Sequence, residues 1–163
     1  MKRISVAILM FLSAITYLAG QSFDWNIRGG INIMDAKTKG KDVAVLYHAG
    51  AEAGIRIANF GFYGELLYSV HENQDGGDPV SYFVPAILMK GYPRKILLLE
   101  MGGAIVAMAG SSDVADNTLN PDKTAYAFAG LGLHISKFDL SMRTNLKKSY
   151  PIIQVTLAVN LSR

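Results

Sequence analysis

The side chains most able to do chemistry in this sequence are charged residues on the polar side of segments in which polar and apolar residues alternate. Alternation with a period of two is typical of a β-strand, whose successive side chains point to opposite faces. If these segments close into one barrel, the charged side chains share its interior. The residues concerned are Arg28, Glu52, Arg56, Glu65, Lys90, Glu100 and Arg143.

Both signs of charge are present in this set, so ion pairing is the expected interaction. Buried charges are tolerated only when they are paired and hydrogen-bonded, and we expect each Glu to face an Arg or Lys of a neighbouring strand. Asp24, His134 and Asp139 are expected at one end of the same interior. The network would be a structural plug. A gate or proton path is the alternative, since ionisable groups at membrane depth are often functional, but a small barrel has little free interior.

Ser69 and His71 are the residues that could support covalent catalysis. They lie two positions apart on one strand face, and hydrolases pair Ser and His with a carboxylate, for which Glu65 or Glu72 is available. A lipid-acting hydrolase is therefore one alternative function. Ordinary polar positions inside a barrel explain both residues more simply, because a triad is recognised by geometry. We predict that the protein is not an enzyme.

The composition excludes several other kinds of chemistry. The sequence has no cysteine, so disulfides, thiolate nucleophiles, Cys-based zinc sites and a lipid-modified N-terminal cysteine are ruled out. It has no phosphate-binding glycine loop and no His-Glu-x-x-His pair. Acidic and amide residues at positions 113–122 could offer oxygen atoms to calcium, but their spacing does not match an EF-hand. We expect no cofactor and no bound metal.

The first twenty residues are typical of a signal peptide. Lys2 and Arg3 precede an uncharged run over residues 4–19 that is shorter than the roughly 20 residues of a membrane-spanning helix. We expect cleavage near Gly20, with residues 1–20 removed and residues 21–163 forming one domain. Loss of the two basic residues lowers the formal net charge from +3 to +1 (3 − 2). Such a chain has no electrostatic footprint for nucleic acid.

Eight alternating segments follow the predicted signal peptide. Most have the length of about ten residues that a tilted strand needs to cross the hydrocarbon layer of a membrane. Pro85 lies within the fourth segment, and because proline cannot donate to a strand ladder we expect local distortion there. The predicted strands are residues 23–34, 45–57, 60–71, 80–92, 95–109, 124–136, 138–147 and 151–162.

The connections between these segments alternate in length. The long, polar ones span residues 35–44, 72–79 and 110–123. Tight turns are predicted at residues 58–59, at residues 93–94 and at Lys137. Short turns at one end and longer loops at the other are typical of an up-and-down outer-membrane barrel. The sequence therefore predicts an all-β, eight-stranded, antiparallel transmembrane barrel.

The apolar face of the strands is expected to meet lipid. It carries most of the large aliphatic and aromatic residues, whereas the interior of eight strands has room only for side chains or one small ligand. Aromatic residues would form two girdles at the membrane surfaces. The periplasmic girdle is Phe23, Trp25, Phe60, Phe62, Tyr92 and Phe138, and the outer one is Tyr47, Tyr68, Phe83 and Tyr150. A soluble secreted carrier of lipocalin type, with the apolar face inside, is the second alternative.

Three stretches of the sequence resemble a known family. They are His48-Ala-Gly-Ala-Glu52-Ala-Gly-Ile-Arg56, Phe62-Tyr-Gly-Glu65-Leu-Leu-Tyr68-Ser69 and Tyr82-Phe-Val-Pro85-Ala-Ile-Leu-Met-Lys90-Gly-Tyr92. Over essentially the whole mature part, the chain resembles the PorT-like outer-membrane β-barrel family of Bacteroidota. The resemblance implies a location and a tolerated proline, but no activity. The chain departs from many outer-membrane barrels by ending in Arg163 rather than in an aromatic residue.

These features together predict a small protein of the bacterial outer membrane, surrounded by lipid and filled by its own side chains. Its role would be structural, adhesive or accessory to secretion. Because rigid scaffolds present binding functions on their connections, an extracellular or envelope protein partner is expected to contact residues 35–44, 72–79 and 110–123.

Overall fold

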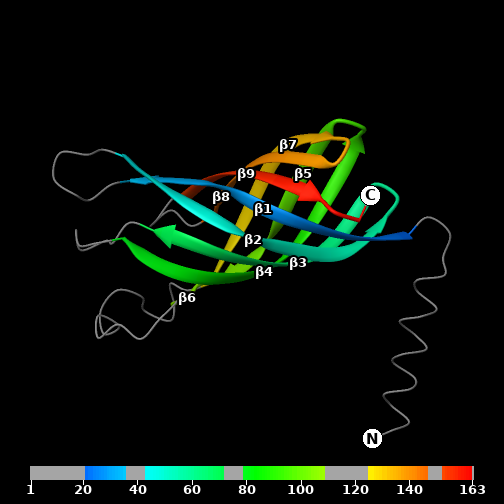
Figure 1. Cartoon of the computed structure of the whole chain (residues 1–163). Coiled ribbons are helices and arrows are strands. Elements are labelled where there is room, and N and C mark those ends of the chain that lie inside the picture. Colours follow the sequence, from blue (N-terminus) through cyan, green and yellow to red (C-terminus); the bar gives the residue numbers. More distant parts are fainter. Residues whose placement is uncertain (1–20, 36–42, 72–78, 109–124, 147–151, 163) are drawn as a thin grey trace, which may run out of the picture.

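The described part of the protein consists of antiparallel β-strands and the turns that join them (Figure 1). The computed structural model describes residues 21–35, 43–71, 79–108, 125–146 and 152–162. Within these ranges there is no helix of the length and hydropathy that a membrane span requires. The strands are β1 (Gln21–Asp35), β2 (Val43–Ile57), β3 (Phe60–His71), β4 (Val80–Arg94), β5 (Leu97–Ile105), β6 (Ala107–Met108), β7 (Ala125–Ile135), β8 (Phe138–Asn145) and β9 (Ile152–Asn160).

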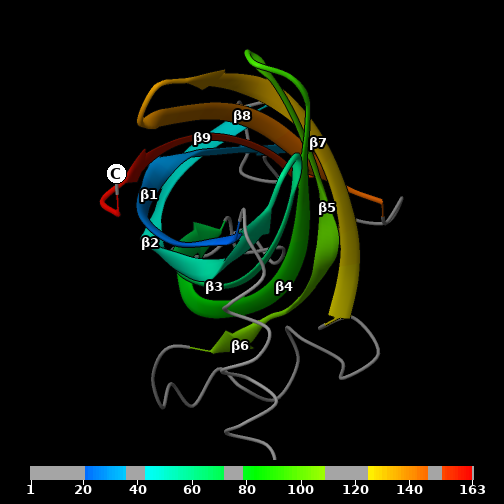
Figure 2. The same ribbon diagram turned by 90° about the vertical axis from the view of Figure 1, so that its right-hand side faces the viewer.

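The sheet closes on itself into a barrel (Figure 2). β1 pairs with β2 on one side and with β9 on the other, so the first and last strands meet. The short β6 continues β5 beyond Val106, and among the described residues it pairs with β4 alone. β5 and β6 therefore count as one interrupted strand. The predicted eight-stranded antiparallel barrel is confirmed.

The interruption between β5 and β6 lies beside Pro85 of β4. The β4–β5 ladder stops at the pair Ala86–Ala104 and resumes as β4–β6 at Phe83–Ala107. Proline has no N–H to donate across this gap. The β3–β4 ladder, by contrast, runs through Pro85 without a shift. The distortion expected at Pro85 is therefore found in the strand next to it.

Tight turns gather at one end of the barrel, here called the turn end. These turns comprise residues 58–59, 95–96 and 136–137. The end of β9 lies beside the third turn, because the N–H of Asn160 donates to the carbonyl oxygen of Lys137. The prediction of a turn at residues 93–94 was wrong, because a register shift between Gly91 and Arg94 lets β4 run on to Arg94. The predicted loops 72–79 and 110–123 and most of loop 35–44 lie outside the described residues.

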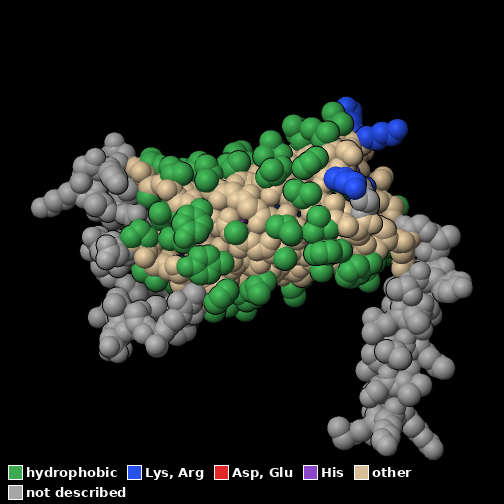
Figure 3. Space-filling view, in the orientation of Figure 1, with side chains coloured by type: hydrophobic (Ala, Val, Ile, Leu, Met, Phe, Trp, Pro, Cys, Tyr) green, Lys and Arg blue, Asp and Glu red, His purple; other side chains and the backbone are tan. Residues whose placement is uncertain are grey.

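Side chains alternate between the interior and the outer wall along most of each strand, although Ser69, Val70 and His71 at the end of β3 are all buried. Along β3, Tyr63, Glu65 and Leu67 are buried while Phe62 and Leu66 are exposed. A register slip by one residue would exchange these faces, so burial of one face fixes the register. Hydrophobic side chains are spread over the barrel wall in the view of Figure 3, with Lys and Arg side chains gathered near one end.

The aromatic residues of the two predicted girdles lie on the outer wall, with one correction. Phe23, Trp25, Phe60, Phe62 and Phe138 near the turn end, and Tyr47, Tyr68 and Phe83 near the other end, are all exposed. Tyr92 is only 5% exposed and faces the interior. It shares a strand face with Lys90, two residues away, so alternation places both inside. Tyr150 lies outside the described residues.

Glycines on the inner face allow neighbouring strands to curve tightly around the narrow interior. A Cβ atom on Gly50 would lie 2.1 Å from the carbonyl oxygen of Leu66, and one on Gly54 would lie 2.0 Å from that of Phe62. No other residue fits at these two positions without a shift of the backbone. Outward glycines differ, since a Cβ on Gly64 would meet nothing within 4 Å.

Candidate functional site

Arg28 of β1 lies at the centre of a group of charged side chains inside the barrel. It is fully buried, and its Nη1 atom donates to Glu52 Oε2 and to Glu65 Oε2, both at 2.6 Å. Its Nη2 atom donates to Glu100 Oε1 at 3.3 Å. Carboxylates from three different strands therefore converge on one guanidinium. The planar fork of Arg donors suits such multiple pairing.

Arg143 of β8 binds the same Glu65 from the other side. Its Nη2 and Nη1 atoms donate to Glu65 Oε1 and Oε2 at 2.7 and 3.1 Å. Between β3 and β8 lie three strands in either direction around the barrel, so this pair joins opposite walls. The Arg28–Glu100 pair joins β1 to β5, which are opposite in the same way. Both pairs therefore cross the full width of the interior.

Lys90 of β4 extends the charged group toward the turn end. Its Nζ atom donates to Glu52 and to Asp139, the latter at 3.1 Å, and lies 3.6 Å from Glu100. Asp139 Oδ1 is in turn 2.5 Å from Nδ1 of His134. We call the connected set the interior ion network. Its members are Arg28, Glu52, Glu65, Lys90, Glu100, Asp139 and Arg143.

The structure brings together six of the seven residues predicted for this network and places Arg56 apart from them. The Arg56 guanidinium lies 3.9 Å from the centroid of the Tyr92 ring, and its Nε atom donates to the carbonyl oxygen of Ala58 at 3.2 Å. Tyr92 thus occupies the interior beside Arg56 at the turn end. Asp139 of β8 joins the network instead, as an acidic partner of Lys90.

A second polar group lies on the β1, β2 and β9 side of the interior, away from the turn end. Asn32 Oδ1 accepts from Gln154 Nε2 at 2.8 Å and bonds His48 Nδ1 at 2.9 Å, while Asn32 Nδ2 donates to Ser69 Oγ at 2.8 Å. Sequence reasoning missed this group, although each member lies on the polar side of its strand. We call it the amide–histidine cluster; its members are Asn32, His48, Ser69, His71, Gln154 and Thr156.

Ser69 and His71 do touch within this cluster, with Ser69 Oγ 2.9 Å from His71 Nε2. Asn32 Nδ2 donates to the same Ser69 oxygen, and the tautomer of the His71 imidazole decides whether Ser69 donates to His71 or accepts from it. Ser69 has no exposed surface, however. The suggested carboxylate of Glu65 is bound by two arginines, and Glu72 lies outside the described residues. The arrangement is a buried hydrogen-bonded pair rather than a nucleophile open to a substrate.

The opposite side of the interior is filled by an apolar cluster. Leu67 and Leu88 at its centre are 0% and 1% exposed. Sequence reasoning expected a polar interior, although the sequences of β4 and β5 carry apolar residues on both faces. The apolar cluster consists of Tyr63, Leu67, Tyr82, Val84, Ala86, Leu88, Ala104, Val106 and Phe128.

The arrangement offers no metal centre in the described ranges, where no group of three or more His, Asp or Glu side chains is placed to hold an ion. The residues considered as calcium ligands, at positions 113–122, lie outside those ranges. The charged side chains of the interior ion network pair with one another and so neutralise one another's charge.

Comparison with known proteins supports the architecture and nothing finer. No family model matches the chain, and no curated protein matches it. Among solved structures, it is similar to Neisserial surface protein A (NspA), with a TM-score of 0.51 and 13% identity over 88% of this chain and 99% of that chain. The two proteins share a fold. At this identity the likeness carries no residue roles from NspA to this chain.

Proposed function

We propose that this protein is an integral barrel of the bacterial outer membrane, closed by its own side chains, which acts as a scaffold for binding, adhesion or secretion. The observation that carries the proposal is the inverted distribution of side chains. Phe62 and Ile87 on the outer wall are 57% and 76% exposed, whereas Arg28 and Lys90 inside are almost fully buried. Soluble proteins rarely expose contiguous apolar patches above a few hundred Å². A wall of this kind is stable when hydrocarbon surrounds it.

Strand length supports a membrane location. A tilted strand needs about 9–11 residues to cross the hydrocarbon layer; β1, β2 and β4 have 15 residues, and β3 has 12. Within the described ranges each of the eight strands, with β5 and β6 counted as one, pairs with a neighbour on both sides. A closed sheet of this kind is the condition for β-structure in lipid. Short turns at one end match the periplasmic end of such barrels, so the predicted loops would face outward.

A plug is favoured over a channel or a proton path because ion pairs cross the interior. Glu65–Arg143 and Arg28–Glu100 join opposite walls, and the apolar cluster fills the remaining side. Passage of an ion would require buried pairs to separate, and leaving a buried charge without its partner costs roughly 3–5 kcal/mol. The same filling argues against the lipocalin-type carrier, which needs an empty apolar cavity.

Family, export and partners belong to the same proposal. The resemblance to PorT-like outer-membrane barrels favours a Bacteroidota-type outer-membrane protein, and the name of NspA describes that neighbour as a surface protein. We propose that residues 1–20 direct export and that residues 21–163 form the barrel. A protein partner would contact residues 35–44, 72–79 and 110–123. The buried Ser69 favours a non-enzymatic role over a lipid hydrolase.

The proposal is tested by expressing the full precursor in a Gram-negative host and separating its membranes. We expect the protein in the outer-membrane fraction, resistant to carbonate extraction, and faster in gel electrophoresis before boiling than after it. Boiling is the internal control, since it unfolds the barrel. Recovery in the soluble periplasmic fraction would overturn the membrane assignment and restore the carrier.

A further inference from the structure

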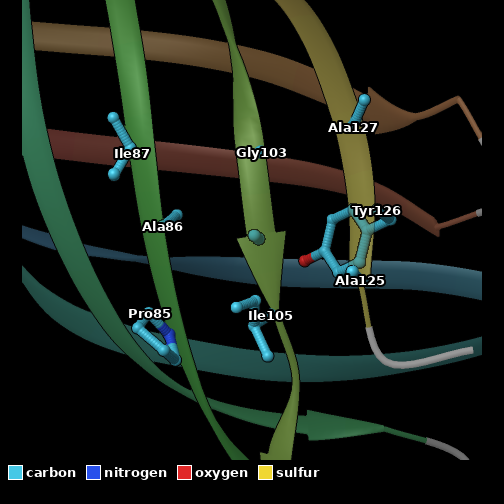
Figure 4. Close-up of a pocket in the computed structure, with 9 residues that line it drawn as sticks. Pro85, Ala86, Ile87, Gly103, Ile105, Ala125, Tyr126 and Ala127 are labelled. Atoms are coloured by element: carbon cyan, nitrogen blue, oxygen red, sulfur yellow. The ribbon is translucent and has the colours of Figure 1, made fainter. Parts of the chain in front are cut away.

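The outer wall contains a hollow of about 750 Å³ that crosses β4, β5 and β7 (Figure 4). Its volume lies within the range of roughly 300–1,000 Å³ of small-molecule sites. The hollow follows from small residues in one row of the wall. Gly103 of β5 pairs with Ile87 on one side and with Ala127 on the other. Ile87 and Ile105, which are 76% and 56% exposed, rise as its flanks.

The packing of the barrel itself does not require a glycine at position 103. A Cβ atom there would meet only the carbonyl oxygen of Tyr126, at 3.9 Å. At the neighbouring inward position, a Cβ on Gly102 would lie 2.3 Å from the carbonyl oxygen of Ile87. The space above Gly103 is therefore open toward the outside, and a larger side chain would fill it without moving the strands.

The hollow coincides with the irregular part of the wall. The β5–β7 ladder ends at the pair Ile105–Ala125, and the strand is then interrupted at Val106 before β6 begins. Tyr126 and Val106 pack with the apolar cluster on the inner side. The buried side chains of Ala86 and Ala104 also line the hollow, so its floor is apolar as well as its flanks.

The lining decides what kind of molecule fits. None of the residues that form it is charged, and the hydroxyl of Tyr126 is the only polar side-chain group among them. The hollow is continuous with the wall that, under the proposed function, faces hydrocarbon. We propose that it binds one acyl chain of a membrane phospholipid, lodged over Gly103 between Ile87 and Ile105. This inference rests on the proposed function and adds a specific lipid position to it.

The test uses the full chain isolated from membranes in dodecyl maltoside micelles that contain dioleoylphosphatidylethanolamine. Native mass spectrometry then counts the phospholipids that remain bound. We expect one retained phospholipid on the wild-type barrel. Gly103→Leu fills the hollow and should lower its retention by about tenfold or more, a factor that corresponds to roughly 1.4 kcal/mol.

Gly29→Leu is the matched control, because a Cβ atom there would likewise meet only one carbonyl oxygen, that of His48 at 3.9 Å, and β1 lies opposite β5 around the barrel. It should retain the phospholipid as the wild type does, and all three proteins should keep heat-dependent gel mobility.

Equal retention by Gly103→Leu and wild type, equal loss in both variants, or a wild-type barrel that carries no phospholipid would overturn the lipid site while leaving the membrane barrel intact. A dimer broken by Gly103→Leu would overturn it in favour of a second copy. A chain that never enters membranes would overturn the proposed function and the inference together.

Discussion

Glu65 on β3 and Arg143 on β8 form a two-bond ion pair across the barrel interior, at 2.7 and 3.1 Å between their nitrogen and oxygen atoms. Because the two strands stand on opposite walls, the pair braces the barrel across its width. Glu65 also accepts from Arg28 at 2.6 Å, so one carboxylate pairs with two guanidinium groups. This position therefore supports more of the network than a single pair would.

Replacing Glu65 with Leu should destabilise the barrel by about 3–5 kcal/mol, because Arg28 and Arg143 would be left buried with too few partners. The measurement is urea unfolding of the protein in phospholipid vesicles. Met142→Leu, on the outer wall beside Arg143, is the control and should change stability by less than about 1.5 kcal/mol. The double variant Glu65→Leu/Arg143→Leu should lose less than the sum of its single changes. An unchanged unfolding midpoint for Glu65→Leu would refute the network.

Adjacent leucines on β3 separate the interior from the wall. Leu67 is 0% exposed in the apolar cluster, whereas Leu66 points outward and is 52% exposed. Leu67→Ala should therefore cost about 2–5 kcal/mol through the lost contacts and the cavity left behind. Leu66→Ala should cost clearly less in the same vesicle unfolding experiment. Equal losses, or a larger loss at Leu66, would contradict the assigned faces.

Much of the barrel is predictable from the sequence because β-strand alternation is local. Burial of one face fixes which residues point inward, and this is enough to place Arg28, Glu52 and Glu65 inside. The turn after β4 is not predictable in the same way, since the bulge near Gly91 depends on pairing with β5. The inward position of Tyr92 was predictable but was missed. Tyr92 lies two residues from Lys90 on β4 and therefore on the same strand face.

Pairing within the interior depends on how far the strands are staggered around the barrel, and no single strand encodes that. The alternation along a strand shows which face a side chain occupies but not its partner. It does not show that Arg143 binds Glu65 on the opposite wall, or that Arg56 lies over the Tyr92 ring. The apolar cluster was missed for a related reason. Its members are spread over several strands, and Phe128 lies among small residues that gave no sign of a shared core.

Ser69 offers a test that distinguishes a structural pair from a catalytic one. Ser69→Ala removes one hydrogen-bond partner each from His71 and Asn32, of which Asn32 keeps the carbonyl oxygen of Val70. A buried polar group left unsatisfied should cost about 1–3 kcal/mol of stability. Release of fatty acid from phospholipid vesicles should be absent in the wild-type protein and in the variant alike. Wild-type hydrolysis that disappears in Ser69→Ala would instead establish the enzyme.

The membrane barrel itself is tested most directly through Trp25, the only tryptophan in the sequence. It lies on β1, on the outer wall, and is 45% exposed. The measurement compares its fluorescence in vesicles of phospholipid with brominated acyl chains and in vesicles of the unbrominated lipid. A lipid-facing wall predicts strong quenching by the brominated chains and little quenching by iodide in the water. Trp25 fluorescence that is quenched by iodide but not by the brominated chains would contradict a lipid-facing outer wall.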